Sequence, residues 1–79
     1  MSIEVKLPQF GMGMQSGTIV GWLKSEGDRV EAGEAIAEVE AEKATSEVTA
    51  PVSGMLSKII VAVDETASVY SVIAYIDPS

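Results

Sequence analysis

The sequence contains no cysteine and no histidine, and these two absences leave it few means of catalysis. Without cysteine there is no disulfide framework, no thiolate metal site and no thiol nucleophile. Without histidine the chain lacks the usual general base near pH 7 and the commonest ligand for transition metals. Self-contained catalysis therefore starts from a poor set of side chains.

Basic residues are also scarce: five Lys and Arg stand against twelve Asp and Glu, which gives a formal net charge of −7. Like-charge repulsion disfavours binding to nucleic acid phosphates or anionic lipid, and a basic protein partner fits better. The first ten residues, MSIEVKLPQF, lack a cationic segment followed by an apolar one, and no segment approaches the roughly 18 apolar residues of a membrane span. We expect a soluble intracellular domain, cytoplasmic or, from a eukaryotic source, in the mitochondrial matrix.

The 79 residues suffice for one compact domain, and they contain an internal repeat. When Gly17 is set against Gly54, 37 residues later, the apolar positions of the two halves coincide without a gap. The matching pairs are Ile19 with Leu56, Trp22 with Ile59, Leu23 with Ile60, Ile36 with Ile73, Ala37 with Ala74, Val39 with Ile76, and Glu40 with Asp77. Two copies are too few for a solenoid, so the repeat predicts two half-domains that close on one core with quasi-two-fold symmetry.

Secondary structure is ambiguous in AGEAIAEVEAEKA, where strong helix formers also alternate as a strand does. The repeat favours the strand, because the matching stretch VIAYI, residues 72 to 76, is β-branched and aromatic. Other strand-like segments are separated by Gly, Pro, Asp and Ser. The predicted fold class is therefore all-β: a flattened barrel or sandwich of two antiparallel sheets with about four strands each.

The turns of the second half differ from those of the first. Gly27 and Gly33 supply two turns in EGDRVEAGE, where positive φ costs glycine little. The second half carries Asp64, Ala67 and Tyr70 in place of Gly27, Val30 and Gly33. We expect its turns to be less regular and its core to be slightly smaller there.

Lys43 falls at a reversal of the chain. The apolar alternation ends at Ala41 and resumes at Ala44, so Glu42 and Lys43 are predicted to form the tip of a tight hairpin with the amine in solvent. An exposed lysine usually serves solubility alone. Lys43, however, lies within a longer run of residues that matches a known family.

The run LPQFGMGMQSGTIVGWLKSEGDRVEAGEAIAEVEAEKATSEVTAPVSG resembles the lipoyl domain of dihydrolipoamide acyltransferases, the cores of 2-oxo acid dehydrogenase complexes. In that family an acidic residue, a lysine and an alanine mark the hairpin, and here they are Glu42, Lys43 and Ala44. The acidic residue is more often Asp, a departure that bears on how a ligase reads the turn. The resemblance implies that lipoic acid is attached to Lys43 as an amide.

The resemblance also implies the partners. A thiamin-dependent 2-oxo acid decarboxylase reductively acylates the dithiolane, an acyltransferase catalytic domain passes the acyl group to coenzyme A, and a flavin dihydrolipoyl dehydrogenase restores the disulfide. A lipoate ligase or lipoyl transferase attaches the cofactor. The reactive groups then belong to the cofactor, so the domain itself is a swinging arm rather than an enzyme.

The loop FGMGMQSG, residues 10 to 17, lengthens the first half: Gly17 lies nine positions after Pro8, whereas Gly54 lies only three positions after Pro51. A phosphate-binding loop is disfavoured, because no Lys-Ser/Thr ending or helix follows. In lipoyl domains the matching loop lies beside the hairpin and helps the decarboxylase to recognise its carrier. Met12, Gly13 and Met14 are therefore candidate recognition residues, and a merely mobile loop is the alternative.

Three carboxylates, Glu40, Glu42 and Glu47, surround the lysine. They either steer basic partner surfaces or are solvated strand faces, and the sequence does not favour one over the other. A catalytic carboxylate pair or a metal site is less favoured, because nothing predicts the burial that would raise a pKa.

Two further features concern packing and boundaries. Trp22 is predicted to be core or half-buried, because its partner in the repeat is Ile59. Residues 1–79 are predicted to be a single lipoyl-like domain, with Asp77-Pro78-Ser79 as the start of a linker.

Alternatives to the lipoyl carrier remain open. A biotin carboxyl carrier shares the expected fold, but that family usually has methionine on both sides of its lysine, where this chain has Glu42 and Ala44. An unmodified acidic β-domain could serve only as an interaction module. The carrier of the glycine cleavage system tends to be longer and to contain helices.

Overall fold

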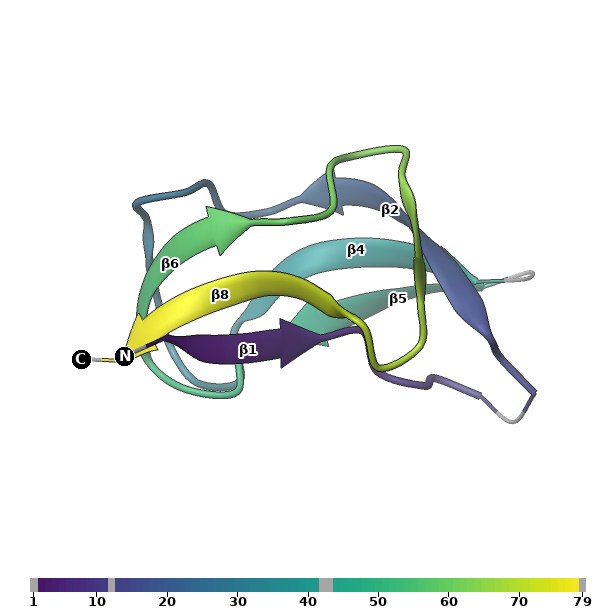
Figure 1. The fold of residues 1–79 in the computed structure, drawn as a ribbon, viewed down its shortest axis with the longest axis horizontal. Coiled ribbons are helices and arrows are strands. Elements are labelled where there is room, and N and C mark those ends of the chain that lie inside the picture. Colours follow the sequence, from purple (N-terminus) through teal and green to yellow (C-terminus); the bar gives the residue numbers. More distant parts are fainter. Residues whose placement is uncertain (1, 12, 42–43, 79) are drawn as a thin grey trace.

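The computed structural model describes residues 2–11, 13–41 and 44–78, which form two four-stranded antiparallel sheets (Figure 1). The strands are β1 (Ile3–Lys6), β2 (Ser16–Trp22), β3 (Arg29–Val30), β4 (Ala35–Ala41), β5 (Ala44–Thr49), β6 (Gly54–Ile59), β7 (Thr66–Ser68) and β8 (Val72–Pro78). One sheet has the order β1-β8-β6-β3 and the other the order β5-β4-β2-β7. The predicted all-β fold is confirmed, as is the choice of strand over helix for residues 35–41. Within the described ranges no helix is long and apolar enough to cross a membrane.

The two halves repeat each other down to the register of their strands. In β2 and β4, Ile19 pairs with Val39, and in β6 and β8 their counterparts Leu56 and Ile76 pair in the same way. Each pair of strands also shifts register just after this point. Such a bulge bends the strand and increases its twist, which lets each sheet wrap over the other. The predicted quasi-two-fold relation is therefore present in the backbone as well as in the sequence.

The core lies between the two sheets and takes alternate residues from both. Val39 and Ile76 are fully buried on β4 and β8, whereas Glu40 beside Val39 is exposed. No polar or charged residue among those described is buried. The largest fully buried side chains are Leu7, Ile19, Ile36, Leu56, Ile73, Ile76, Val5, Val30, Val39 and Val48.

The two glycines that align in the repeat, Gly17 and Gly54, are each in close contact with a neighbouring strand. A Cβ on Gly54 would meet the carbonyl oxygen of Asp77 and lie 2.9 Å from Pro78 Cα. A Cβ on Gly17 would lie 2.6 Å from Val39 Cγ1. At Gly54 the backbone of β8 leaves no room for a side chain, whereas at Gly17 a Cβ would have to displace the side chain of Val39.

The turns of the second half keep the conformation of the first, so the expectation of less regular turns is wrong. Asp64 and Tyr70 have φ of 73° and 69°, close to the 94° and 86° of their counterparts Gly27 and Gly33. The hydrogen bonds are also repeated: the amide of Gly27 donates to Leu56 O at 2.7 Å, and that of Asp64 donates to Ile19 O at 2.6 Å. Because a left-handed backbone costs a non-glycine residue about 1 kcal/mol or more, the second half keeps these turns at some cost in stability.

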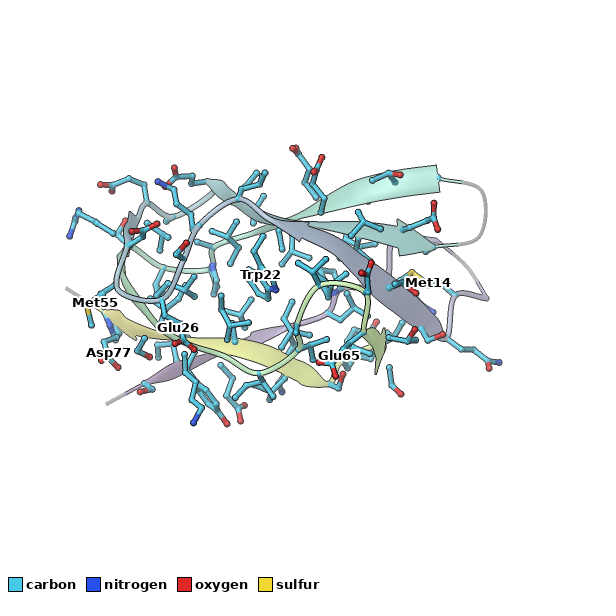
Figure 2. All side chains as sticks on the ribbon, turned by 90° about the horizontal axis from the view of Figure 1, so that it is seen from above. Met14, Trp22, Glu26, Met55, Glu65 and Asp77 are labelled. Atoms are coloured by element: carbon cyan, nitrogen blue, oxygen red, sulfur yellow. The ribbon has the colours of Figure 1, made fainter. Side chains whose placement is uncertain are left out.

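Trp22 lies between the sheets, and the prediction that it is packed rather than free is confirmed (Figure 2). Its ring is half-buried against the core, and its indole Nε1 donates to Val61 O at 2.9 Å. Trp22 ends β2, and Val61 follows β6. The contact therefore joins the two halves of the repeat.

The first and last described residues lie together, at the opposite end of the molecule from the end of β4 and the start of β5 (Figure 1). Ser2 Oγ donates to Asp77 Oδ1 at 2.7 Å, and β8 continues to Pro78, which pairs with Gly54. Asp77 and Pro78, which the sequence suggested as the start of a linker, are thus paired within the sheet. Ser79 lies outside the described residues.

Candidate functional site

The β4–β5 hairpin extends beyond the core towards its tip. Val39 is fully buried, Ala41 is half-buried and Ala44 is exposed, although Ala41 and Ala44 still form a backbone pair. Pairing up to the last described residues on both sides gives the tip a regular two-stranded base. The predicted site residue Ala44 is thus the first residue of β5, exposed at the end of the molecule.

Two residues, Glu42 and Lys43, join Ala41 to Ala44 in the sequence. Both predicted site residues lie outside the described residues. The residues on either side, Ala41 and Ala44, are small and carry no atom beyond Cβ. A covalently attached cofactor brings its own reactive groups, so the protein has only to position it.

The outer face of the hairpin is acidic. Glu40 is exposed and pairs with Thr18 on one side and with Thr45 on the other. Glu38 lies directly opposite Glu47 across the two strands, an arrangement of like charges that destabilises a sheet. None of these three carboxylates takes part in an ion pair with the described residues. The structure thus places Glu40 and Glu47 on one exposed face, an arrangement that fits both steering of a basic partner and a solvated strand face.

The β1–β2 loop, residues 7–15, lies at the same end of the molecule, but Met14 is not on its surface. The Met14 side chain is 6% exposed and belongs to the core, and its Sδ accepts a hydrogen bond from the amide of Phe10 at 3.4 Å. The expectation that Met14 offers an adaptable side chain to a partner does not fit this burial, and its role here is to anchor the loop. Gly13 is exposed with φ of 83°, and Met12 lies outside the described residues.

Gln9 and Tyr70 also belong to this region, and neither is a site residue predicted from the sequence. Gln9 Nε2 donates to Met14 O at 3.1 Å, and the Tyr70 hydroxyl lies 3.5 Å from Gln9 Oε1, to which it donates. Tyr70 stands where the repeat has Gly33, a difference visible in the sequence that could have pointed to it. Gln9 carries no comparable signal.

Among the described residues, the one displaced pKa belongs to Glu34, which lies away from the hairpin in the turn before β4. The Glu34 carboxylate accepts a hydrogen bond from the backbone amide of Glu31 at 2.9 Å and lies 3.1 Å from Lys24 Nζ. The bond from the Glu31 amide, reinforced by Lys24, lowers the pKa of Glu34 below its ordinary value of 4.5. This turn stabilises the start of β4 rather than offering a general acid or base.

A metal site has no support in the part of the chain that the structure describes, where no group of three or more acidic side chains could hold an ion. The hairpin, its acidic face and the adjoining loop are therefore the candidate site.

Comparison with known families gives a match over most of the chain. Residues 3–76 match the biotin/lipoyl family model, which is described as "Biotin-requiring enzyme". The match includes all of β1 to β7 and most of β8, and it spans the connection between β4 and β5.

Three curated relatives carry the names of pyruvate dehydrogenase components. The chain is 41% identical over 76 residues to the dihydrolipoyllysine-residue acetyltransferase component of the pyruvate dehydrogenase complex of Corynebacterium glutamicum, covering 96% of this chain and 11% of that protein. It is 46% identical over 61 residues to the component of the same name from Rickettsia typhi, covering 77% of this chain and 15% of the relative. It is also 44% identical over 62 residues to the pyruvate dehydrogenase E1 component subunit beta of Rhizobium meliloti, covering 78% of this chain and 14% of that protein. The chain thus spans less than a sixth of the length of these relatives.

Solved structures share the fold. The lipoyl domain of the 2-oxoglutarate dehydrogenase complex from Azotobacter vinelandii has a TM-score of 0.76 and 26% identity, covering 98% of this chain and 99% of that one. The urea carboxylase of Kluyveromyces lactis has a TM-score of 0.82 at 23% identity, covering 98% of this chain and 6% of that one, and shows the fold alone.

Proposed function

This chain belongs to the biotin/lipoyl attachment family as a lipoyl domain, and from that premise we propose that Lys43 is amidated by lipoic acid and carries acyl groups between active sites of a 2-oxo acid dehydrogenase complex. The strongest support for the proposal is the pairing of β4 with β5 up to the end of the hairpin. The β4–β5 hairpin stays paired as far as Ala41 and Ala44 and projects beyond the core, with Lys43 in the two-residue connection that follows.

The physical chemistry of a lysine amide suits such a carrier. A free lysine amine with a pKa near 10.4 is protonated at neutral pH and is a poor base, whereas its amide is neutral and flexible. Amidation of Lys43 would change the formal charge of the chain from −7 to −8. The protein therefore supplies position and the lipoyl group supplies thiol and disulfide chemistry, so a chain without cysteine or histidine suffices.

The two ends of the domain have separate roles in this proposal. The hairpin lies at one end of a molecule whose longest extent is 35 Å, and the first and last described residues lie at the other (Figure 1). An attached arm would thus project away from the point where further chain would join. Tethering of this kind raises the effective concentration of the arm at each active site, to the order of mM with a flexible linker.

The partners follow from the same proposal. A thiamin-dependent 2-oxo acid decarboxylase would acylate the arm, an acyltransferase catalytic domain would transfer the acyl group to coenzyme A, and a flavin dihydrolipoyl dehydrogenase would reoxidise the dithiol. A lipoate ligase or lipoyl transferase would load Lys43. Because the relatives with acetyltransferase names belong to pyruvate dehydrogenase complexes, pyruvate is the first 2-oxo acid to test.

Intact mass after co-expression with a lipoate ligase tests the attachment. We expect one lipoyl increment on the wild-type chain, none on Lys43→Arg, and the full increment on the control Lys58→Arg, because Lys58 lies on β6 in the other sheet. A parallel co-expression with a biotin ligase separates the two members of the family. A biotin increment on Lys43, or a lipoyl increment that survives Lys43→Arg, would contradict the proposal.

Reductive acylation then tests the complex. The lipoylated chain is offered to pyruvate, 2-oxoglutarate and branched-chain decarboxylase components, each with its own 2-oxo acid, and acylation is followed by mass. We expect one component to acylate the chain far faster than the others. A lipoylated chain that none of them acylates would reduce the function to an unassigned carrier or an interaction module.

A further inference from the structure

β5 is the outermost strand of the hairpin sheet, and one of its edges is open (Figure 1). It is the longest of the four edge strands that the structure describes: β5 has six residues, whereas β1 has four, β7 three and β3 two. Within the described ranges β5 pairs with β4 alone. An open edge of this length presents a row of backbone groups to which another strand can bind.

The alternation of the strand shows which backbone groups face the open edge. Directly after β5, the amide of Ala50 donates to Glu34 O at 2.9 Å, so Ala50 faces the side of β4. Because successive residues of a strand direct their amide and carbonyl groups to opposite sides, Thr45, Glu47 and Thr49 face away from β4. Their amides and carbonyls have no backbone bond to another segment among the described residues, and they extend over about 13 Å of strand.

The corresponding edge of the other sheet is protected against further pairing, and that of β5 is not. β1 occupies this place in the second sheet, where it carries Lys6, shifts register between Val5 and Lys6, and is followed by Pro8. Lysine, irregular pairing and proline are features by which proteins keep an edge strand from pairing further. β5 contains neither lysine nor proline, and its register against β4 is regular from Ala44 to Val48.

The charge of the surrounding face determines which strand fits this edge. Glu47 lies opposite Glu38 on β4, and neither carboxylate takes part in an ion pair seen among the described residues. A strand added at the open edge places a side chain directly opposite Glu47 on its other side, where a cation would offset the repulsion between the two carboxylates. A second copy of this chain would instead bring its own carboxylates and a net charge of −7.

We propose that the open edge of β5 binds an extended, basic segment of a partner protein, which adds a strand to the hairpin sheet. The backbone groups of Thr45, Glu47 and Thr49 bind the segment through main-chain hydrogen bonds, and a Lys or Arg of the segment opposite Glu47 provides the charge preference. This inference goes beyond the proposed function, because it depends on the backbone of β5 and not on what is attached to Lys43.

The test uses a synthetic strand as the probe. In the peptide acetyl-VKVKVKV-amide, valine alternates with lysine, so that all its lysines lie on the face of Glu47 when it pairs with β5. The peptide is titrated at low salt into the isotope-labelled chain and followed by NMR. We expect the amides of Thr45, Glu47 and Thr49 to shift and to exchange more slowly with solvent, and Kd to rise as salt is added. The peptide acetyl-VEVEVEV-amide should bind about tenfold more weakly.

Two matched variants isolate the charge of the edge. Glu47→Thr and Glu4→Thr each remove one carboxylate, from equivalent positions on β5 and β1. Glu47→Thr should raise the Kd of the lysine peptide about fivefold, the factor that corresponds to one favourable exposed ion pair. Glu4→Thr lowers the net charge equally and should leave Kd almost unchanged.

A second pair of variants isolates the backbone. Thr49→Pro removes one amide at the open edge without changing the charge, and proline is tolerated where the amide of an edge strand faces solvent. Thr49→Val keeps the amide and removes only the hydroxyl. We expect Kd to rise about fivefold for Thr49→Pro, the factor for one lost hydrogen bond, and to stay the same for Thr49→Val. If the NMR spectrum shows that Thr49→Pro does not fold, the comparison of Glu47→Thr with Glu4→Thr decides.

Several results would overturn the proposal. Amide shifts could be absent or could centre on β1, β3 or β7, the glutamate peptide could bind as tightly as the lysine peptide, or Glu47→Thr and Glu4→Thr could weaken binding equally. Sedimentation of the wild-type chain without peptide tests the other occupant, and we expect a monomer. A dimer whose formation shifts the amides of β5 would show that the edge binds a second copy. A chain that is not lipoylated would contradict the proposed function and leave this inference standing.

Discussion

The two sheets have the same backbone and different outer faces. At three exposed or half-exposed positions the hairpin sheet carries Glu38, Glu40 and Glu47. The equivalent positions of the other sheet are Tyr75, Asp77 and Glu4. That second face also carries Lys6 and Lys58, and Lys6 Nζ lies 3.8 Å from Glu4 Oε1.

The difference shows which features the fold requires and which it does not. Register, bulges and buried residues are repeated in both halves, because each half must cover the same core. The uniform negative charge is found only on the sheet that ends in Lys43, and it includes the opposed pair Glu38 and Glu47, which works against stability. The fold therefore does not require the charge on that face.

The largest effect is expected from the glycine pair. Gly54→Ala should lower the free energy of unfolding by about 3 kcal/mol, because its Cβ would meet the backbone of Asp77 and Pro78. Gly17→Ala should cost less, about 1 to 2 kcal/mol, because its Cβ meets the side chain of Val39, which can shift. Denaturant unfolding followed by Trp22 fluorescence measures both.

Gly11 provides the control for this pair. A Cβ there would have no atom within 4 Å, so Gly11→Ala should leave the free energy of unfolding almost unchanged. Equal costs at Gly11 and Gly54 would show that the effect does not come from the close approach of the strands, because the loss of glycine's backbone entropy by itself favours the alanine variant.

The second comparison concerns the turns. Tyr70→Gly places a glycine at the position that corresponds to Gly33 in the first half. It should raise the free energy of unfolding by about 1 kcal/mol, which corresponds to a rise in Tm of about 4–8 °C. Asp64→Gly should gain less, because aspartate tolerates the left-handed region better than tyrosine. A Tm that falls on Tyr70→Gly would mean that contacts of the ring outweigh the strain of its backbone.

A smaller effect is expected from the opposed carboxylates. Glu47→Lys replaces a like-charge pair with an attractive one opposite Glu38 and should raise the free energy of unfolding by about 0.5 kcal/mol at low salt. The gain should shrink as the ionic strength increases. At the equivalent position of the other sheet, Glu4→Lys lies opposite Tyr75 and should give no gain, which makes it the matched control.

The smallest effect concerns pH. Because the pKa of Glu34 is lower in the folded chain than its ordinary value of 4.5, ionised Glu34 stabilises the fold above that value, and this contribution is lost as the pH falls through the folded pKa. Glu34→Gln should therefore reduce the loss of stability on acidification, seen as a shallower fall of Tm below about pH 4.5. At the corresponding position of the second half, Ser71 cannot titrate, so Ser71→Ala should leave that slope unchanged.

Much of the fold could be predicted from the repeat. Residues 35–41 have helix-forming composition, and only their alignment with VIAYI indicated the strand that is observed. The same alignment led to a wrong expectation for the turns, because it treated Asp64 and Tyr70 as a loss of regularity. In the structure both take the left-handed conformation of Gly27 and Gly33, since the hydrogen bonds and packing around the turns outweigh the local preference.

The site was only partly predictable. The position of Lys43 between two apolar alternations predicted a hairpin, and the paired Ala41 and Ala44 agree with it, although the lysine itself lies outside the described residues. Met14 was expected at the surface because methionine in a glycine-rich loop resembles an adaptable contact. Its burial depends on the space beside Gly17, which no local pattern reveals.

By itself the sequence determined the two-fold repeat, the strand pattern and the place of the single lysine between Ala41 and Ala44, because periodicity and spacing are local properties that survive without coordinates. Tertiary structure alone decided that Met14 enters the core, that Gln9 and Tyr70 meet across the loop, and that Asp77 and Pro78 belong to a sheet. Those facts depend on contacts between residues distant in the chain, such as Tyr70 with Leu7 and Gly54 with Pro78. Such contacts form only when the two halves close on their common core.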